Sequence, residues 1–285
     1  MFDTNRFAGV TLDVPRIMGI INVTPDSFSD GGEAWLLEDA VTRGHAMIAA
    51  GADMLDIGGE STRPGADPVD EKEEIARVVP VIRALAADGV LVSIDTRHAE
   101  VMRAAIAAGA RIVNDVTALT GDDGSLAVVA DAGVDVILMH MQGEPRTMQV
   151  RPSYKDVVKD VYSFLDSRIS ACKSAGVPKE RIAIDPGIGF GKALQHNLAL
   201  IAHIDTFQSL GTAVVLGASR KQFIGQISDV EEVADRVMGS VASVLAARAR
   251  GAQIFRVHDV IETRQALSLI HISEPTRRYA ISYAV

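Results

Sequence analysis

Short apolar runs recur along the chain, and each one stops at or beside a residue with a polar or charged side chain. There are eight such runs, and a stretch with helical periodicity follows each of them. The polar residues at their ends are, in order, Asn22, Asp56, Asp95, Asn114, His140, Asp185, Ser219 with Lys221, and His258. Strands this apolar are typical of parallel sheets that helices cover. Eight such units predict an α/β fold with one closed (β/α)8 barrel, a TIM barrel, whose active site lies at the carboxyl ends of the strands.

The predicted barrel accounts for nearly the whole chain as a single domain. The chain has 285 residues, and its 48% hydrophobic content is ample for a barrel core and an outer ring of helices. No linker rich in proline, serine or charge interrupts the alternation of strands and helices. We expect long loops after the first, second and fifth strands, and the longest irregular stretch, residues 141–153, follows the fifth. Barrels place functional loops at such positions, so this stretch is interpreted as a loop and not as a domain boundary.

The last residues differ in character from the rest of the chain. Residues 267–277 read like the translation of a transposase adapter used in sequencing libraries, and Pro275 interrupts the helix expected to start near Val260. We therefore interpret residues 1–266 as the barrel domain and residues 267–285 as a non-native tail that carries no functional weight.

The alternation of side chains along the strands predicts which polar residues face the barrel interior. Side chains two residues apart in a strand share a face. Shared faces are expected for Met18, Ile20 and Asn22, for Ser93 and Asp95, for Ile112 and Asn114, for Ala183 and Asp185, and for Ile254, Arg256 and His258. When the deeper member of each set fills the core, the last member looks into the mouth of the barrel. Burying Asp95, Asn114 and Asp185 there without partners is unfavourable, which favours a ligand site over helix caps.

Net charge and composition exclude several kinds of partner. The formal net charge is −9 and no basic cluster is present, so a nucleic-acid partner is not expected. No segment has the composition of a signal peptide or of a membrane span, which predicts a cytoplasmic protein without a membrane partner. The single cysteine, Cys172, falls on a predicted amphipathic helix and is interpreted as a buried structural thiol.

Familiar catalytic motifs are absent from the chain. The glycines of residues 187–191 miss the spacing of a dinucleotide-binding loop and indicate a turn that lets the backbone approach a ligand beside Phe190. Residues 217–221 do not form a nucleophile elbow, because Lys221 stands where that motif needs glycine. No H-E-x-x-H or cysteine–histidine cluster exists, which argues against zinc. Mg2+ held mainly by substrate phosphates needs one or two protein oxygens, and Asn22 offers one.

Several polar segments in series resemble one enzyme family. They are residues 22–32 (NVTPDSFSDGG), 56–65 (DIGGESTRPG), 93–96 (SIDT), 114–115 (ND), 185–192 (DPGIGFGK), 219–221 (SRK) and 256–259 (RVHD). In order and in barrel position they resemble the dihydropteroate synthase family of pterin-binding barrels, from about Arg16 to Ala266. The resemblance implies a transferase of folate biosynthesis, which joins p-aminobenzoate to a dihydropterin-methyl diphosphate and releases pyrophosphate.

The resemblance also implies roles for the residues at matching positions. The implied pterin pocket consists of Asp95, Asn114, Met139, Asp185, Phe190, Gly217, Lys221 and Arg256. Asp185 accepts hydrogen bonds from the pterin edge in this interpretation, and the Arg256 guanidinium packs on the pterin face. Asn22 is the implied Mg2+ ligand, and the implied catalytic residues are Arg63, Lys221, Arg256 and His258. The implied p-aminobenzoate pocket, on loops that close over the diphosphate, consists of Phe28, Thr62, Arg63, Pro64 and Ser219.

The resemblance implies a homodimer formed through the last helices, and a long apolar helix predicted over residues 233–249 suits such an interface. Two other functions share the barrel: a corrinoid-dependent methyltransferase pterin domain and a noncatalytic pterin-binding paralogue. Arg63 and residues 219–221 disfavour the methyltransferase, because its reaction has no diphosphate leaving group for them to bind. The paralogue is disfavoured because every family motif in the chain is intact.

Overall fold

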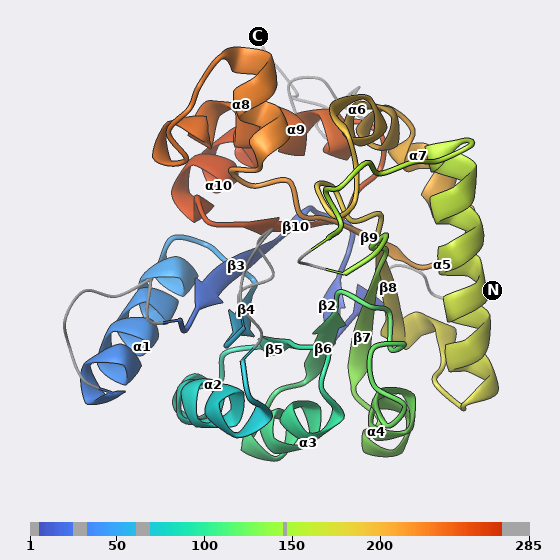
Figure 1. The fold of residues 1–285 in the computed structure, drawn as a ribbon. Helices are drawn as coiled ribbons and strands as arrows, with labels where there is room; N and C mark the ends of the chain where they lie inside the picture. Colours follow the sequence, from blue (N-terminus) through green and yellow to red (C-terminus); the bar gives the residue numbers. More distant parts are fainter. Residues whose placement is uncertain (1–5, 25–32, 61–68, 145–146, 270–285) are drawn as a thin grey trace, which may run out of the picture.

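Eight parallel strands close into a barrel in the computed structural model, which describes residues 6–24, 33–60, 69–144 and 147–269 (Figure 1). Each strand is hydrogen-bonded to its neighbours in the order β10-β3-β4-β5-β6-β7-β8-β9. The strands are β3 (Arg16–Asn22), β4 (Met54–Gly58), β5 (Val92–Asp95), β6 (Ile112–Asp115), β7 (Asp135–Met139), β8 (Ile182–Asp185), β9 (Ala213–Leu216) and β10 (Ile254–Val257). The predicted TIM barrel is therefore confirmed.

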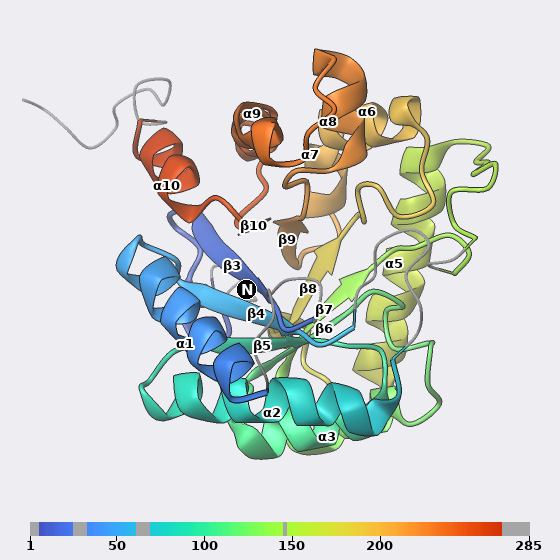
Figure 2. The same cartoon turned by 60° about the vertical axis from the view of Figure 1, so that its left-hand side comes forward.

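Helices surround the barrel, as the two views in Figures 1 and 2 show. Those within the described residues are α1 (Glu33–Ala49), α2 (Glu71–Ala87), α3 (Ala99–Ala108), α4 (Ser125–Ala132), α5 (Val157–Ser174), α6 (Leu194–Ala202), α7 (Ile204–Gln208), α8 (Gln222–Ser228), α9 (Val237–Arg248) and α10 (Val260–Ser268). Single 3-10 turns occur at Lys179–Arg181 and Ala234–Arg236. Long connections follow β3, β4 and β7, the first, second and fifth barrel strands, as predicted. None of the helices in these ranges is long and apolar enough to span a membrane.

The hydrophobic core has two layers, which follow from the alternation along the strands. Inward side chains form a cluster within the barrel that includes Met18, Met54, Ile112, Ile137, Ala183, Ala213, Val215 and Ile254. Outward side chains of the same strands pack with the buried faces of the helices in a second, larger cluster. Strand residues are therefore buried on both faces, which explains the continuous apolar runs in the sequence.

A small hairpin closes the amino-terminal end of the barrel. Its two-residue strands, β1 (Arg6–Phe7) and β2 (Val10–Thr11), pair antiparallel. Phe7 and Leu12 join the inner cluster, and the backbone N–H of Ala8 donates to the side chain of Asp135, the first residue of β7, at 3.2 Å. The sequence analysis did not predict this hairpin, because strands of two residues are too short to show periodicity.

The strand register agrees with the prediction that the polar strand ends share the inward face of the barrel. Asn22 is opposite Gly58, Gly58 is opposite Asp95, and Asp95 is opposite Asn114. On the other side of the barrel, Met139 of β7 pairs with Asp185 of the adjacent strand β8. Neighbouring residues in parallel strands point to the same side, so these side chains surround a common opening at the carboxyl ends.

Of the two helices predicted near the end of the chain, one begins later than predicted and the other begins where predicted. The helix predicted over residues 233–249 begins at Val237, after a 3-10 turn in which the Arg236 side chain donates to the carbonyls of Val230 and Arg220, both at 3.3 Å. α10 begins at Val260, as predicted, and runs to Ser268, with Leu267 buried in the outer core. The boundary between barrel and tail after residue 266 stays a prediction, because residues 270–285 lie outside the described ranges.

Candidate active site

An arginine on β10 connects two carboxylates on β4 and β5 beneath the mouth of the barrel. Nε of Arg256 donates to Oδ2 of Asp56 at 2.5 Å, and its terminal nitrogen donates to Oδ2 of Asp95 at 2.6 Å. Burial lowers the pKa of Arg256, but the charges of Asp56 and Asp95 outweigh this effect and raise it overall. Burial raises the pKa of Asp95, Arg256 opposes the rise, and Asp56 adds to it. The guanidinium is thereby held charged and in one orientation.

Asp56 is a site residue to which the sequence analysis assigned no role. Its side chain is fully buried, and Oδ2 accepts a hydrogen bond from Nδ2 of Asn114 at 3.0 Å as well as the one from Arg256. A single carboxylate therefore positions two of the predicted pterin-binding side chains. The signal for it was present in the sequence, because Asp56 is two residues from the core residue Met54 and shares its inward face.

Asp185 and Gly217 form the opposite side of the opening. Oδ1 of Asp185 accepts a hydrogen bond from the backbone N–H of Gly187 at 2.7 Å. A Cβ atom at Gly217 would lie 3.3 Å from the other oxygen, Oδ2, and 3.9 Å from the side chain of Arg256. Glycine at the end of β9 therefore leaves space in front of Asp185 and Arg256. Burial raises the pKa of Asp185, whereas Lys221 and then Gly187 and Arg256 oppose the rise.

Lys221 and Phe190 form the next part of the opening. Nζ of Lys221 donates to the backbone carbonyl of Ile188 and lies 4.5 Å from the centre of the Phe190 ring. Burial lowers the pKa of Lys221 to about 8, against the opposing charge of Asp185. Lys221 is thus in direct contact with residues 187–191. The sequence analysis interpreted these residues as a glycine turn that lets the backbone approach a ligand.

Ser219 and His258 contact each other. Ser219 Oγ lies 3.0 Å from Nδ1 of His258 and accepts a hydrogen bond from the His258 backbone N–H at 3.1 Å. Asn22 lies on another side of the opening, where a Cβ atom at Gly58 would be 3.8 Å from Oδ1 of Asn22 and 3.8 Å from Oδ2 of Asp95. The candidate residues Phe28, Thr62, Arg63 and Pro64 lie outside the described residues.

Lys192 is a buried lysine that holds the turn beside Phe190 in place. The sequence analysis assigned no role to it. Nζ of Lys192 lies 3.0 Å from Nδ1 of His140 and donates to the carbonyls of His140 at 3.2 Å and Phe190 at 2.9 Å. Burial lowers the pKa of Lys192 to about 7. Burial, with a smaller effect from Lys192, lowers the pKa of His140 to about 3. Met139, which precedes His140, is buried at the end of β7 under this turn.

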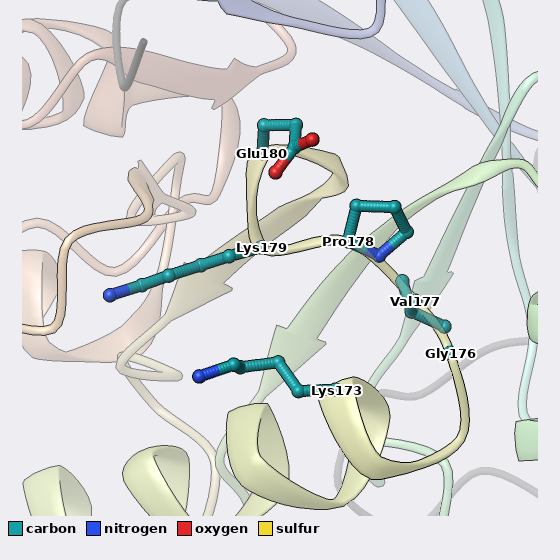
Figure 3. A pocket seen from close by; sticks show the side chains of 6 residues that line it. All are labelled: Lys173, Gly176, Val177, Pro178, Lys179 and Glu180. Carbon is teal, nitrogen blue, oxygen red and sulfur yellow. The ribbon is translucent and has the colours of Figure 1, made fainter. Parts of the chain in front are cut away.

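A pocket elsewhere on the barrel does not belong to this site. It lies between the end of α5 and the start of β8, and its lining residues are Lys173, Gly176, Val177, Pro178, Lys179 and Glu180 (Figure 3). These residues precede a strand, so they lie toward the amino-terminal ends of the strands. The polar side chains that converge between Asn22 and His258 lie at the carboxyl ends, where barrel enzymes have their active sites.

Comparison with known proteins agrees with this geometry. The model of the family described as pterin binding enzyme matches residues 18–258. A protein of Escherichia coli (strain K12) named dihydropteroate synthase is 46% identical over 265 residues, 92% of this chain and 93% of its own length. A structure of Xanthomonas albilineans dihydropteroate synthase with 4-aminobenzoic acid has a TM-score of 0.88 and 50% identity, covering 93% of this chain and 94% of that one. A second structure of that enzyme, with 7,8-dihydropteroate, has a TM-score of 0.85 and 48% identity, covering 93% and 95%.

The fold and the polar mouth define a barrel enzyme with its site at the strand ends. The family match and the relatives make the assignment specific: the chain belongs to the dihydropteroate synthases, a family of pterin-binding transferases. The family predicted from the sequence is thus confirmed, and neither the corrinoid methyltransferase nor the noncatalytic paralogue is favoured.

Proposed function

We propose that this chain condenses (7,8-dihydropterin-6-yl)methyl diphosphate with p-aminobenzoate, giving 7,8-dihydropteroate and pyrophosphate. The observation that carries the proposal is the buried Asp185 carboxylate, which faces the space left open by Gly217 and whose pKa the cations Lys221, Arg256 and Lys192 lower against the effect of burial. The Xanthomonas albilineans structures with 4-aminobenzoic acid and with 7,8-dihydropteroate support the choice of substrate and product.

The arrangement suits the aminopyrimidinone edge of a pterin. That edge presents adjacent N–H donors, which one carboxylate accepts in bidentate fashion, and Asp185 has Oδ2 directed at the open space. Lys221 supplies a donor for ring acceptors, and the planar Arg256 guanidinium offers a surface for the ring face, which an ammonium group could not provide. Asp56 holds Arg256 and Asn114 in place for this task.

The leaving diphosphate needs positive charge near the bond that breaks. Arg256 supplies it from β10, His258 offers a ring nitrogen beside it after the end of the same strand, and Arg63 is proposed to supply positive charge from the loop after β4. Mg2+ prefers oxygen ligands and keeps most of its coordination for phosphates and water, and Oδ1 of Asn22, beside Gly58 at the opening, is proposed as its protein ligand. When bound, Mg2+ neutralises charge on the departing pyrophosphate.

No covalent nucleophile is needed, because the C–O bond weakens before the amine of p-aminobenzoate attacks the methylene carbon. Among the described residues, two side chains that could in principle act as nucleophiles, a serine and the cysteine, are not placed to do so. Ser219 is hydrogen-bonded to His258, and Cys172 is buried on α5, where burial raises its pKa to about 11. The protein therefore orients the two substrates and excludes water from the reacting carbon.

The p-aminobenzoate pocket is proposed to combine Ser219 with Phe28, Thr62, Arg63 and Pro64. Only Ser219 lies within the described residues, and it follows β9 beside His258.

We further propose a homodimer and a cytoplasmic location. The exposed apolar side chains of Met238 on α9 and Ile261 on α10 suit the dimer interface. All of these are carried by the family resemblance.

Product formation tests the proposal. The purified chain is incubated with the dihydropterin-methyl diphosphate, p-aminobenzoate and Mg2+, and 7,8-dihydropteroate is measured by chromatography with mass detection. We expect product in this mixture and at least a 100-fold lower rate with Asp185→Asn, because an amide would place a donor against the pterin donors. Absence of product from a folded wild-type chain that binds the diphosphate would contradict the proposal.

A further inference from the structure

Three side chains from three separate elements converge beside the carboxyl ends of β4 and β5. Glu60 follows β4, Glu74 lies on α2 and His98 is the residue before α3. One carboxylate oxygen of each glutamate and one ring nitrogen of His98 all lie within 4.8 Å of one another. None of these side chains has a part in the reaction derived above.

Glu74 is buried in a way that requires a partner. It belongs to the buried face of α2, together with Val78, and its side chain is 0% exposed. Among the described residues, neither of its carboxylate oxygens has a hydrogen-bond partner of good geometry, and burial raises the pKa of Glu74 to about 7 although the nearby Thr96 side chain opposes the rise. A Cβ atom at Gly59 would lie 2.9 Å from Cγ of Glu74, so glycine at this position allows α2 to hold the glutamate against the end of β4. A buried carboxylate without hydrogen bonds is rare and points to a missing ligand.

His98 has the orientation of a metal ligand. Its Nδ1 faces Oε1 of Glu71 at 3.6 Å, while Nε2 lies 3.8 Å from Oε2 of Glu60. Within the described part of the chain, Nε2 is buried and makes no hydrogen bond. Histidines that bind metals commonly direct one ring nitrogen at a carboxylate, which orients the other nitrogen toward the ion. Glu71 therefore stands where a metal site would need a supporting carboxylate.

The charge of the cluster suits a divalent cation. Arg97 donates to both oxygens of Glu60, from Nε at 3.1 Å and from a terminal nitrogen at 3.0 Å. Each carboxylate oxygen has two lone pairs, so this ion pair leaves Glu60 able to accept a further ligand. With Glu74 ionised, the carboxylates of Glu60, Glu71, Glu74 and Asp122 around His98 exceed the single guanidinium by three negative charges, and a divalent ion reduces this excess.

We propose that Glu60, Glu74 and His98 form a binding site for a divalent transition-metal ion, with Zn2+ as the ion that fits best. Two carboxylates and one imidazole suit zinc, and the fourth position is left for water. Ligand atoms around tetrahedral zinc lie about 3.3 Å apart, so the separation of 3.8 Å between Glu60 and His98 closes with small side-chain rotations. The site is distinct from the oxygen ligands of Mg2+ at Asn22, and its ligands are too dispersed in sequence to form a recognisable zinc motif.

Metal titration of the full chain tests this proposal. The chain is stripped with a chelator and titrated with Zn2+ by calorimetry, without any diphosphate, and in parallel with Co2+ by visible absorption. We expect one equivalent of Zn2+ to bind with a Kd of about 1 μM or tighter, unaffected by millimolar Mg2+. Saturating zinc should raise the melting temperature by about 5 °C.

Variants distinguish this site from other zinc ligands on the chain. Glu74→Gln and His98→Ala should each weaken Zn2+ binding at least 100-fold and remove the cobalt absorption bands. His45→Ala is the matched control, because His45 also faces a carboxylate, Asp88 at 3.1 Å, but both side chains are largely exposed. If Glu74→Gln does not fold, His98→Ala decides alone, because that ring is partly exposed. Absence of saturable binding, or binding that His98→Ala leaves unchanged, would overturn the proposal.

Discussion

Arg256 and Asp56 are separated by 200 residues in the sequence, yet Nε of the arginine donates to Oδ2 of the aspartate at 2.5 Å. The same oxygen accepts the amide of Asn114, and the other end of the guanidinium reaches Asp95. Side chains from four strands are thus joined through one fully buried carboxylate. The pterin pocket proposed here therefore depends on a residue that lies below it.

Asp56→Asn is expected to weaken binding of the dihydropterin-methyl diphosphate by about 10- to 100-fold. The variant keeps the side-chain volume but removes the charge, and a hydrogen bond to a charged group contributes about 1.5–3 kcal/mol. Calorimetric titration measures the affinity. Asp53→Asn is the control, because Asp53 also pairs with two arginines, Arg16 at 3.0 Å and Arg264 at 2.8 Å, but precedes β4 at the other end of the barrel. Equal losses of affinity in both variants would contradict the positioning role of Asp56.

A side chain at Gly217 should obstruct the pterin pocket in proportion to its size. The Cβ atom of Gly217→Ala would lie 3.3 Å from Oδ2 of Asp185, and Gly217→Val would add two methyl groups in the same space. We expect reduced affinity for the pterin substrate in the alanine variant and no saturable binding in the valine variant. Both should keep the wild-type circular dichroism spectrum. Normal affinity in Gly217→Val would show that the pterin does not lie against Asp185.

Removing the side chain that closes the base of the barrel should affect stability without affecting the site. Phe7 is 1% exposed within the inner cluster, and a buried phenylalanine replaced by alanine destabilises by about 3–5 kcal/mol. Phe7→Ala should therefore lower the free energy of unfolding, measured in urea, while pterin affinity stays unchanged. Val14→Ala serves as the control, because Val14 is exposed and should change little. A loss of pterin affinity in folded Phe7→Ala would show that the hairpin reaches the active site.

His140 should make the folded state sensitive to acid. Burial, together with Lys192, lowers its pKa from 6.5 to about 3, so its contribution to stability is present above pH 6.5 and is lost as the pH falls toward 3. Between pH 6.5 and pH 5 the wild type should lose up to about 2 kcal/mol more stability than His140→Gln. Urea unfolding at the two pH values measures the difference. Identical losses in the two proteins would mean that His140 is protonated in the folded state.

Much of the fold could be predicted from the sequence, because barrel strands are buried on both faces and leave long apolar runs. The same periodicity placed Asn22, Asp95, Asn114 and Asp185 on the inward faces at the carboxyl ends of their strands, and the strand pairing agrees with this. Asp56 was noted as the polar residue of the second apolar run, and it shares the inward face of Met54, but no role was assigned to it. Its role depends on contacts with Arg256 and Asn114, which lie on strands distant in the sequence.

Other features depend on contacts between distant elements, which periodicity does not report. Lys192 and His140 meet because the loop after β8 folds over the end of β7. Glu74 and His98 come together only when α2 and the start of α3 pack beside β4. Phe28 and Arg63 were assigned through the family resemblance alone, and their roles stay predictions because they lie outside the described residues.

Pyrophosphate release by the purified chain, with and without p-aminobenzoate, tests the central claim most directly. The assay contains the dihydropterin-methyl diphosphate and Mg2+, and a coupled enzyme reports pyrophosphate continuously. We expect release that rises with p-aminobenzoate concentration, saturates, and equals the amount of 7,8-dihydropteroate formed. A chain that binds the diphosphate but releases no pyrophosphate, or releases it at the same rate without p-aminobenzoate, would contradict the account.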